Sequence, residues 1–94
     1  MQIKHHNIDD DGIFYIDDNG KRMGDMRYMI DQDRQMDIYH TEVDPEIEGQ
    51  NWGKQLIEAA VNYARENQLK IVPSCTFAKA VFTRHTQYQD VLLD

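Results

Sequence analysis

The stretch that decides the fold of this chain covers residues 37–72 and reads DIYHTEVDPEIEGQNWGKQLIEAAVNYARENQLKIV. Its first seven residues are suited to a strand. From Trp52 the apolar residues recur with a helical period, which lasts until about Asn67. Residues 69–72 form a short apolar segment that is suited to a strand and ends at Pro73. A strand, a helix and a second strand in this order predict a right-handed crossover between two parallel strands.

The part of the chain before this stretch predicts antiparallel strands. The expected strands cover residues 3–6, 12–16, 22–30 and 36–43. Asn19-Gly20 separates the second from the third, and this dipeptide is a strong hairpin signal because both residues tolerate positive φ. Met26, Tyr28 and Ile30 are expected to share one face of the third strand.

The part after it predicts a second helix over residues 76–84, with Phe77, Ala80 and Val81 as its buried side. Residues 87–93 suit one further helical turn. On the first helix the expected apolar face consists of Trp52, Leu56, Ala59, Ala60, Tyr63 and Ala64. The predicted fold is therefore a single α/β domain over residues 1–94, with the order β-β-β-β-α-β-α and a mixed antiparallel and parallel sheet.

The charge and composition narrow the class of partner. A formal net charge of −7 argues against a nucleic-acid backbone or an anionic membrane, because both would repel the protein. The acidity leaves room for a cationic substrate such as an amine. The chain has one cysteine, no apolar run long enough to span a bilayer, and no apolar stretch among its first residues. These features predict a cytoplasmic protein.

Two features near the amino terminus mimic metal sites. Asn7, Asp9 and Asp11 have the spacing of a calcium loop, but the residues before them are too few to form its first helix. His5-His6 lacks the further ligands that zinc requires. No metal is expected.

Gly49 and Gly53 bracket a polar loop that leads directly into the first helix. Such a loop presents unpaired backbone N–H groups at the positive end of the helix dipole, which is a favourable place for a phosphate. Gln50 and Lys54 would add a polar contact and a charge. The alternative is an ordinary loop in which glycine only satisfies a turn.

Residues 37–92 resemble the small stand-alone GNAT-like N-acetyltransferases. The most specific part of the resemblance is the tail motif Pro-x-Cys-x-Phe-Ala, followed by Arg-His and Tyr-Gln-Asp, which appears as Pro73, Cys75, Phe77, Ala78, Arg84, His85, Tyr88, Gln89 and Asp90. The family's loop signature is Arg/Gln-x-x-Gly-x-Gly/Ala. Here Glu48 and Asn51 depart from it, and Asn51 is the non-glycine residue best suited to left-handed backbone.

The resemblance implies acetyl-coenzyme A as co-substrate and an amine as acceptor. It places the pyrophosphate on the loop and helix start, and the pantetheine arm on backbone amides of the strand before the loop, which splays from its parallel neighbour. The implied coenzyme-binding residues are Glu42, Val43, Gly49, Gln50, Asn51, Trp52, Gly53, Lys54, Arg84 and His85. For Trp52, core packing is the favoured role.

Four side chains are candidates for the chemistry. His40 and Glu42 share one strand face, and either can accept the proton of the amine; the alternative is a solvated polar stripe. Cys75 is expected at the start of the second helix, as a nucleophile or as a bystander in the site. Tyr88 is a candidate donor of a proton to the leaving thiolate; the alternative is that it packs the tail, and that Arg84 and His85 cap the helix.

Two functions are therefore consistent with the sequence. One is an acetyl-coenzyme A-dependent N-acetyltransferase. The other is a non-catalytic module that binds coenzyme A or an acyl-coenzyme A, which Glu48 favours because a carboxylate repels a pyrophosphate. The chain is too short for the helices that larger members of the family insert between early strands. An open acceptor face is therefore expected, which suits a protein or peptide amine. The sequence leaves the oligomeric state open.

Overall fold

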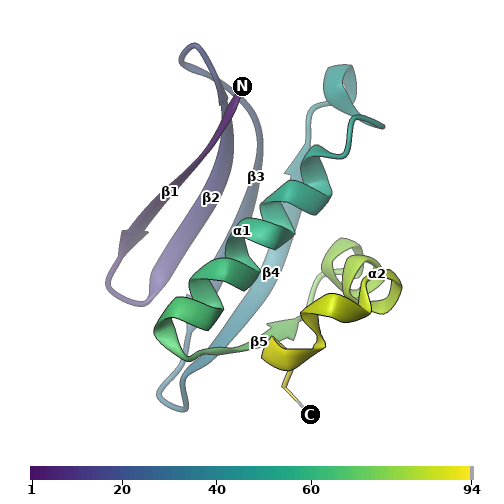
Figure 1. Cartoon of the computed structure of the whole chain (residues 1–94). Helices are drawn as coiled ribbons and strands as arrows, with labels where there is room; N and C mark the ends of the chain where they lie inside the picture. Colours follow the sequence, from purple (N-terminus) through teal and green to yellow (C-terminus); the bar gives the residue numbers. More distant parts are fainter. Residues whose placement is uncertain (94) are drawn as a thin grey trace.

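The computed structural model describes residues 1–93 and forms one five-stranded sheet with the spatial order β1-β2-β3-β4-β5 (Figure 1). The elements are β1 (Gln2–Ile8), β2 (Asp11–Asp18), β3 (Lys21–Ile30), β4 (Gln35–Val43), the 3-10 turn η1 (Pro45–Ile47), α1 (Trp52–Asn67), β5 (Lys70–Pro73), α2 (Thr76–Arg84) and the 3-10 turn η2 (Thr86–Val91). This is the predicted order, with the further helical turn at the tail.

The first four strands are antiparallel neighbours, and β5 pairs with β4 in parallel, as the crossover predicts. At the β2–β3 turn Asn19 and Gly20 have φ of 50° and 92°, which confirms the hairpin expected from Asn-Gly. The first strand is longer than expected and reaches Ile8.

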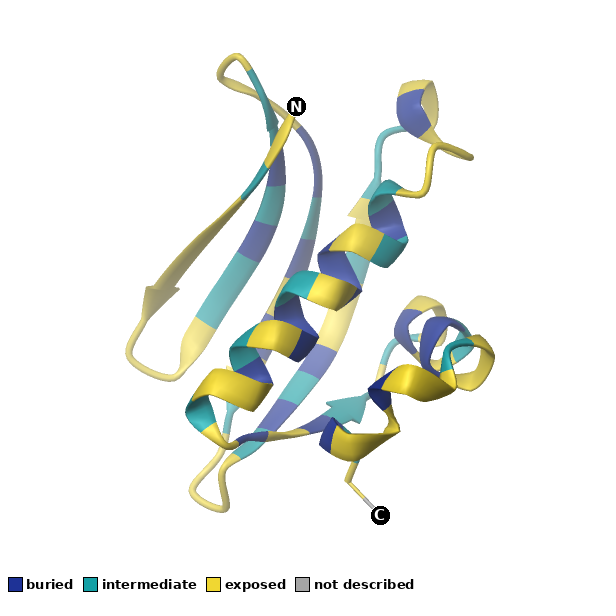
Figure 2. Ribbon diagram, viewed as in Figure 1, coloured by how far each residue is buried: buried dark blue, intermediate teal, exposed yellow. Residues whose placement is uncertain are grey.

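The helix α1 lies diagonally across one face of the sheet, with its buried side turned toward the strands (Figure 2). Met26 and Tyr28 are buried beneath it and Ile30 is half-buried, so the predicted face of β3 is confirmed. On α1 the buried residues are Gly53, Leu56, Ile57, Ala60, Val61 and Ala64, while Trp52, Ala59 and Tyr63 pack along the edges.

The predicted face of α2 was wrong by one position. Ala78, Val81 and Phe82 are buried, whereas Ala80 is half-buried and Phe77 is 39% exposed. Both sets satisfy a helical period, so the pattern alone did not decide between them. The helix lies beside α1 (Figure 1). The ring of Phe77 approaches Gly53 in the first turn of α1.

No helix covers the opposite face of the sheet within residues 1–93. On this open face β4 contains a β-bulge. Arg27 of β3 pairs with His40, but the next residue, Tyr28, pairs with Ile38, so Tyr39 is the extra residue of β4. In the same described part of the chain, no helix is long and apolar enough to cross a membrane.

Candidate active site

The parallel strands β4 and β5 separate near the middle of β4. Their pairing covers only four residues of each strand and ends at Ile38 opposite Pro73. The backbone N–H groups of Ser74 and Cys75 then both donate to the carbonyl of Ile38, at 3.0 and 3.1 Å, and turn the chain into α2. β4 continues to Val43, paired only with β3 on its other side. The strand before the loop therefore splays from its parallel neighbour.

A cleft of about 790 Å³ opens where the strands part, within the roughly 300–1,000 Å³ typical of small-molecule sites. It lies between the end of β4, the loop before α1, the first turn of α1 and one side of α2. Its lining residues are Thr41, Glu42, Val43, Pro45, Ile47, Glu48, Gly49, Asn51, Trp52, Gly53, Lys54, Phe77, Val81, Arg84 and His85. Nine of the ten residues expected to bind coenzyme are among them, and Gln50 is the exception.

The loop before α1 has the geometry of an anion cradle. Gly49 and Asn51 have φ of 81° and 72°, so Asn51 keeps the left-handed backbone expected of it. Asn51 occupies the N-cap position but makes no side-chain cap hydrogen bond, and the first turn of α1 contains no acidic residue. The first amides of the helix are therefore left without a side-chain partner, as an anion site requires.

The charges around the cleft are mixed. Lys54, Arg84 and His85 line it, together with the carboxylates of Glu42 and Glu48. The cationic side chains come from the first turn of α1 and from the end of α2, so two separate elements direct positive charge into the same space. Carboxylates at the cleft wall, such as that of Glu48, repel an anion.

Close packing of α1 on α2 forms the inner end of the cleft. A Cβ atom added to Gly53 would lie 2.3 Å from Cζ of Phe77, so any larger residue would have to displace this ring. Trp52 is half-buried, packs against the core and also lines the cleft. Both roles considered for Trp52 are therefore compatible with its position.

Cys75 lies at the N-cap of α2, as expected, and is half-buried. Its Sγ accepts the backbone N–H of Ala78 at 3.4 Å and lies 3.4 Å from Oγ1 of Thr41. Thr41 lines the cleft, whereas Cys75 does not. The thiol therefore contacts a residue of the cleft wall, Thr41, but is not itself part of that wall.

His40 and Glu42 lie together on the open face, as the period of the strand predicts. Nε2 of His40 lies 3.6 Å from Oε2 of Glu42 and 3.7 Å from Oδ1 of Asp25 on β3. Glu42 also lines the cleft, but His40 does not. Glu42 is therefore the residue that joins this polar group to the cleft.

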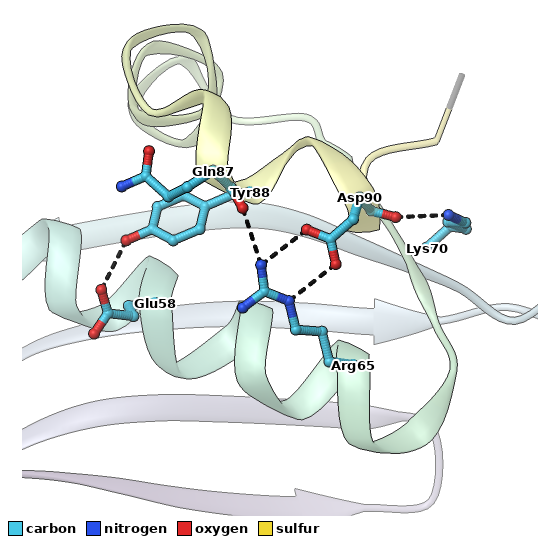
Figure 3. A network of polar contacts seen from close by, with 6 residues as sticks. All are labelled: Glu58, Arg65, Lys70, Gln87, Tyr88 and Asp90. Atoms are coloured by element: carbon cyan, nitrogen blue, oxygen red, sulfur yellow. Dashed lines mark hydrogen bonds and ion pairs between the residues drawn. The ribbon is translucent and has the colours of Figure 1, made fainter.

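The ring of Tyr88 lies 6.0 Å, centroid to centroid, from the ring of His85, which lines the cleft. Tyr88 is buried, and its hydroxyl donates to Oε2 of Glu58 on α1 at 2.7 Å (Figure 3). Burial and this hydrogen bond raise the pKa of Tyr88. Tyr88 is not among the residues that line the cleft. The structure thus places it where the tail packs on α1, which was the alternative to proton donation.

The sequence analysis did not identify Thr41 and Asp25, which contact candidate residues of this site. Thr41 alternates with Val43 along β4, so the period of the strand contained a signal for it. Asp25 lies on a neighbouring strand, and its place beside His40 depends on a register that is shifted by the bulge at Tyr39. No spacing within the sequence indicates that shift.

Comparison with known proteins agrees with this geometry. The sequence profile of a family described as GCN5-related N-acetyl-transferase matches residues 13–91. Among solved structures, a GCN5-like protein from Staphylococcus aureus, assigned as an N-acetyltransferase, is 40% identical with a TM-score of 0.77. The alignment covers 98% of this chain and 87% of that one. Among curated proteins, none matches the sequence.

More distant structures share the fold. An aminoglycoside N-acetyltransferase in complex with coenzyme A is 15% identical, with a TM-score of 0.68 and 88% of each chain covered. The ribosomal-protein-S18-alanine N-acetyltransferase of Escherichia coli is 19% identical, with a TM-score of 0.67; the match covers 83% of this chain and 53% of that one. On the family profile and the 40% identical neighbour, this chain belongs to the GCN5-related N-acetyltransferase family.

Proposed function

We propose that this protein transfers an acetyl group from acetyl-coenzyme A to an amine carried by a protein or peptide. The observation that carries the proposal is the cleft at the divergence of β4 and β5, which ends at the uncapped amino terminus of α1. The amides of the first turn and the side chains of Lys54 and Arg84 suit a pyrophosphate. The unpaired edge of β4 at Glu42 and Val43 suits the pantetheine arm and the thioester oxygen.

The reaction needs a neutral amine next to a polarised thioester. The ammonium group loses its proton to His40, and Glu42, 3.6 Å from that imidazole and on the cleft, attracts the cationic acceptor. The free amine attacks the carbonyl carbon, a C–N bond forms, and the C–S bond breaks. The nitrogen of the new amide then loses one proton, and the coenzyme leaves as a thiolate that takes up this proton through water. Cys75 stands behind Thr41 and remains a neighbour of the site rather than its nucleophile.

The open face of the sheet supports a macromolecular acceptor. Within residues 1–93 no helix lies over His40 and Glu42, and both side chains are exposed. An amine on a protein surface can approach such a face without entering a closed chamber. A small metabolite would find little surface there to bury.

One observation favours the second candidate, a non-catalytic module that binds coenzyme A. Glu48 lines the cleft close to the loop that would hold the pyrophosphate, and this carboxylate weakens anion binding. The two candidates differ in whether acetyl-coenzyme A is consumed when an amine is present.

Calorimetry with acetyl-coenzyme A and, separately, with coenzyme A tests the site. Glu48→Arg should tighten coenzyme A binding by roughly fivefold, because it removes one partly screened repulsion and adds an attraction. Glu46→Arg is the matched control, because Glu46 is an exposed carboxylate of the preceding turn that does not line the cleft.

Equal gains in both variants would mean that general charge, and not the cleft, binds the ligand. Wild-type protein that shows no heat with either ligand would overturn the proposed function. Consumption of acetyl-coenzyme A in the presence of a lysine-containing peptide, measured by the release of free thiol, distinguishes an enzyme from a binding module.

A further inference from the structure

One carboxylate on the open face of the sheet is almost covered by its neighbours. The side chain of Asp25, on β3, is only 15% exposed, and its Oδ1 is buried without a hydrogen-bond partner. Nε of Arg27 lies 3.6 Å from this oxygen, and Nε2 of His40 lies 3.7 Å from it. Both distances are too long for hydrogen bonds but lie within the range of ion pairs.

The register of the sheet explains why a carboxylate is needed at this position. Arg27 lies directly opposite His40, and Asp25 lies opposite Glu42. Arg27 therefore places a permanent positive charge on the strand position across from His40, and this charge repels the imidazolium form. The charged groups that face His40 are Asp25 and Arg27 from β3 and Glu42 from its own strand. On the other side, the pairing of β5 with β4 ends at Ile38, before His40 is reached.

We propose that Asp25 is a positioning residue for His40. Its carboxylate offsets the charge of Arg27 and attracts the imidazole, so that His40 can take up the proton of the acceptor ammonium next to Glu42. The imidazolium produced by this transfer lies between two carboxylates, at 3.6 and 3.7 Å, and is stabilised by both. The inference rests on the proposed acetyl transfer, but its electrostatic part can be tested in the free protein.

The experiment has two readouts in the same variants. The first is the NMR titration of the His40 imidazole in the protein without ligand. The second is the pH profile of kcat/KM with acetyl-coenzyme A and a lysine-containing peptide. Asp25→Asn should move the His40 titration to lower pH, because it removes one of the two carboxylates beside the imidazole. In the same variant, the acid limb of the pH profile of kcat/KM should also move to lower pH. The activity at neutral pH should fall, because His40 would be a weaker base.

Two further variants test the opposite charges of Arg27 and Asp25 separately. Arg27→Ala removes the opposing charge and should move the titration of His40 to higher pH. Asp25→Glu keeps the carboxylate and should restore most of the wild-type profile. Asp37→Asn is the matched control, because Oδ1 of Asp37 is also buried without a hydrogen-bond partner, but Asp37 lies opposite Met29 and makes no ion pair with His40.

An unchanged titration of His40 in Asp25→Asn, with the fold intact by thermal melting, would overturn the proposal. So would a moved titration with an unmoved pH profile, since His40 would then not be the base. The titration needs no acetyl-coenzyme A. A failure of Asp25 to act on His40 is therefore distinguishable from a failure of the protein to transfer acetyl groups.

Discussion

At the scale of single residues, Cys75 shows how a residue of a sequence motif can have a structural role. Its Sγ accepts the N–H of Ala78 and so caps α2, the helix that forms one side of the cleft. The same atom contacts Thr41, which lines the cleft, so Cys75 supports the cleft wall without lining it. A cap explains the residue at this position without a covalent step in the reaction.

The two roles of Cys75 predict different outcomes for two substitutions. Cys75→Ser keeps an acceptor for Ala78, so stability should be close to that of the wild type. Cys75→Ala removes it and should cost about 0.5–1 kcal/mol in the free energy of unfolding, measured by thermal melting. Both variants should keep measurable acetyl transfer to a lysine-containing peptide. Complete loss of transfer in both, with coenzyme affinity and folding unchanged, would instead identify Cys75 as a nucleophile.

Much of the site at this scale could be predicted from the sequence, because it depends on local chain order. The loop with Gly49 and Asn51 follows a strand and precedes a helix, and its conformation follows from these neighbours. The place of Asp25 beside His40 and the hydrogen bond of Tyr88 to Glu58 could not be predicted in this way. Both depend on which segments lie side by side, which the period of one segment does not contain.

At the scale of elements, the contact between α1 and α2 sets the shape of the inner cleft. Gly53 has ordinary helical backbone, so its role is steric and not conformational. The ring of Phe77 occupies the space of the missing Cβ. The prediction that Phe77 is buried failed because a helix with apolar residues on more than one face can turn either way. Here the fit of Ala78 and Phe82 into the core decides the orientation.

A double-mutant cycle tests this contact. Gly53→Ala should destabilise the wild-type protein by about 1–2 kcal/mol, because its Cβ would lie 2.3 Å from Cζ of Phe77 and must displace the ring. Phe77→Leu removes the ring atoms that approach the Cβ. In that background Gly53→Ala should become neutral or stabilising by up to about 1 kcal/mol, through the higher helix propensity of alanine.

Equal effects of Gly53→Ala in the two backgrounds, measured by urea unfolding, would contradict the contact. Calorimetry should be carried out on the wild type, the two single variants and the double variant. Coenzyme A should bind more weakly to Gly53→Ala, if the ring of Phe77 is displaced into the cleft. Retained affinity in Gly53→Ala would mean that Phe77 moves toward the solvent instead.

At the scale of the whole molecule, the order of elements and the parallel pairing of β5 could be predicted because they follow from handedness and connection length. The docking of the C-terminal segment could not. It depends on Arg65, whose exposed side chain gives no signal in an apolar pattern. Arg65 binds both carboxylate oxygens of Asp90 at 2.8 and 2.9 Å and the carbonyl of Gln87 at 3.0 Å (Figure 3).

This docking holds η2 against α1 and thereby keeps Tyr88 and Val91 in the core. Lys70, at the start of β5, adds a hydrogen bond from its Nζ to the carbonyl of Asp90 at 2.7 Å. The segment therefore connects α1, β5 and α2, which are the three elements that follow the splayed strand. Weakening the contacts of this segment should therefore lower the stability of the whole domain rather than change the cleft locally.

Arg65→Ala should lower the Tm at pH 7 by roughly 2–5 °C, as expected for loss of an exposed but bidentate ion pair in a small domain. The effect should depend on pH with a definite sign. The hydrogen bonds from Arg65 hold the pKa of Asp90 below its usual value. A carboxyl whose pKa is depressed by folding adds stability above its unfolded pKa, near 3.9, and loses it as the pH falls through the folded pKa.

The difference in Tm between the wild type and Arg65→Ala should therefore be full at neutral pH and shrink below about pH 4. Asp90→Asn is the control, because it has no titrating group at this position. In that background Arg65→Ala should cost less, and its cost should not vary with pH. A difference in Tm that stays constant from pH 7 to pH 3 would show that the carbonyl of Gln87, and not the carboxylate of Asp90, holds the segment on α1 through Arg65.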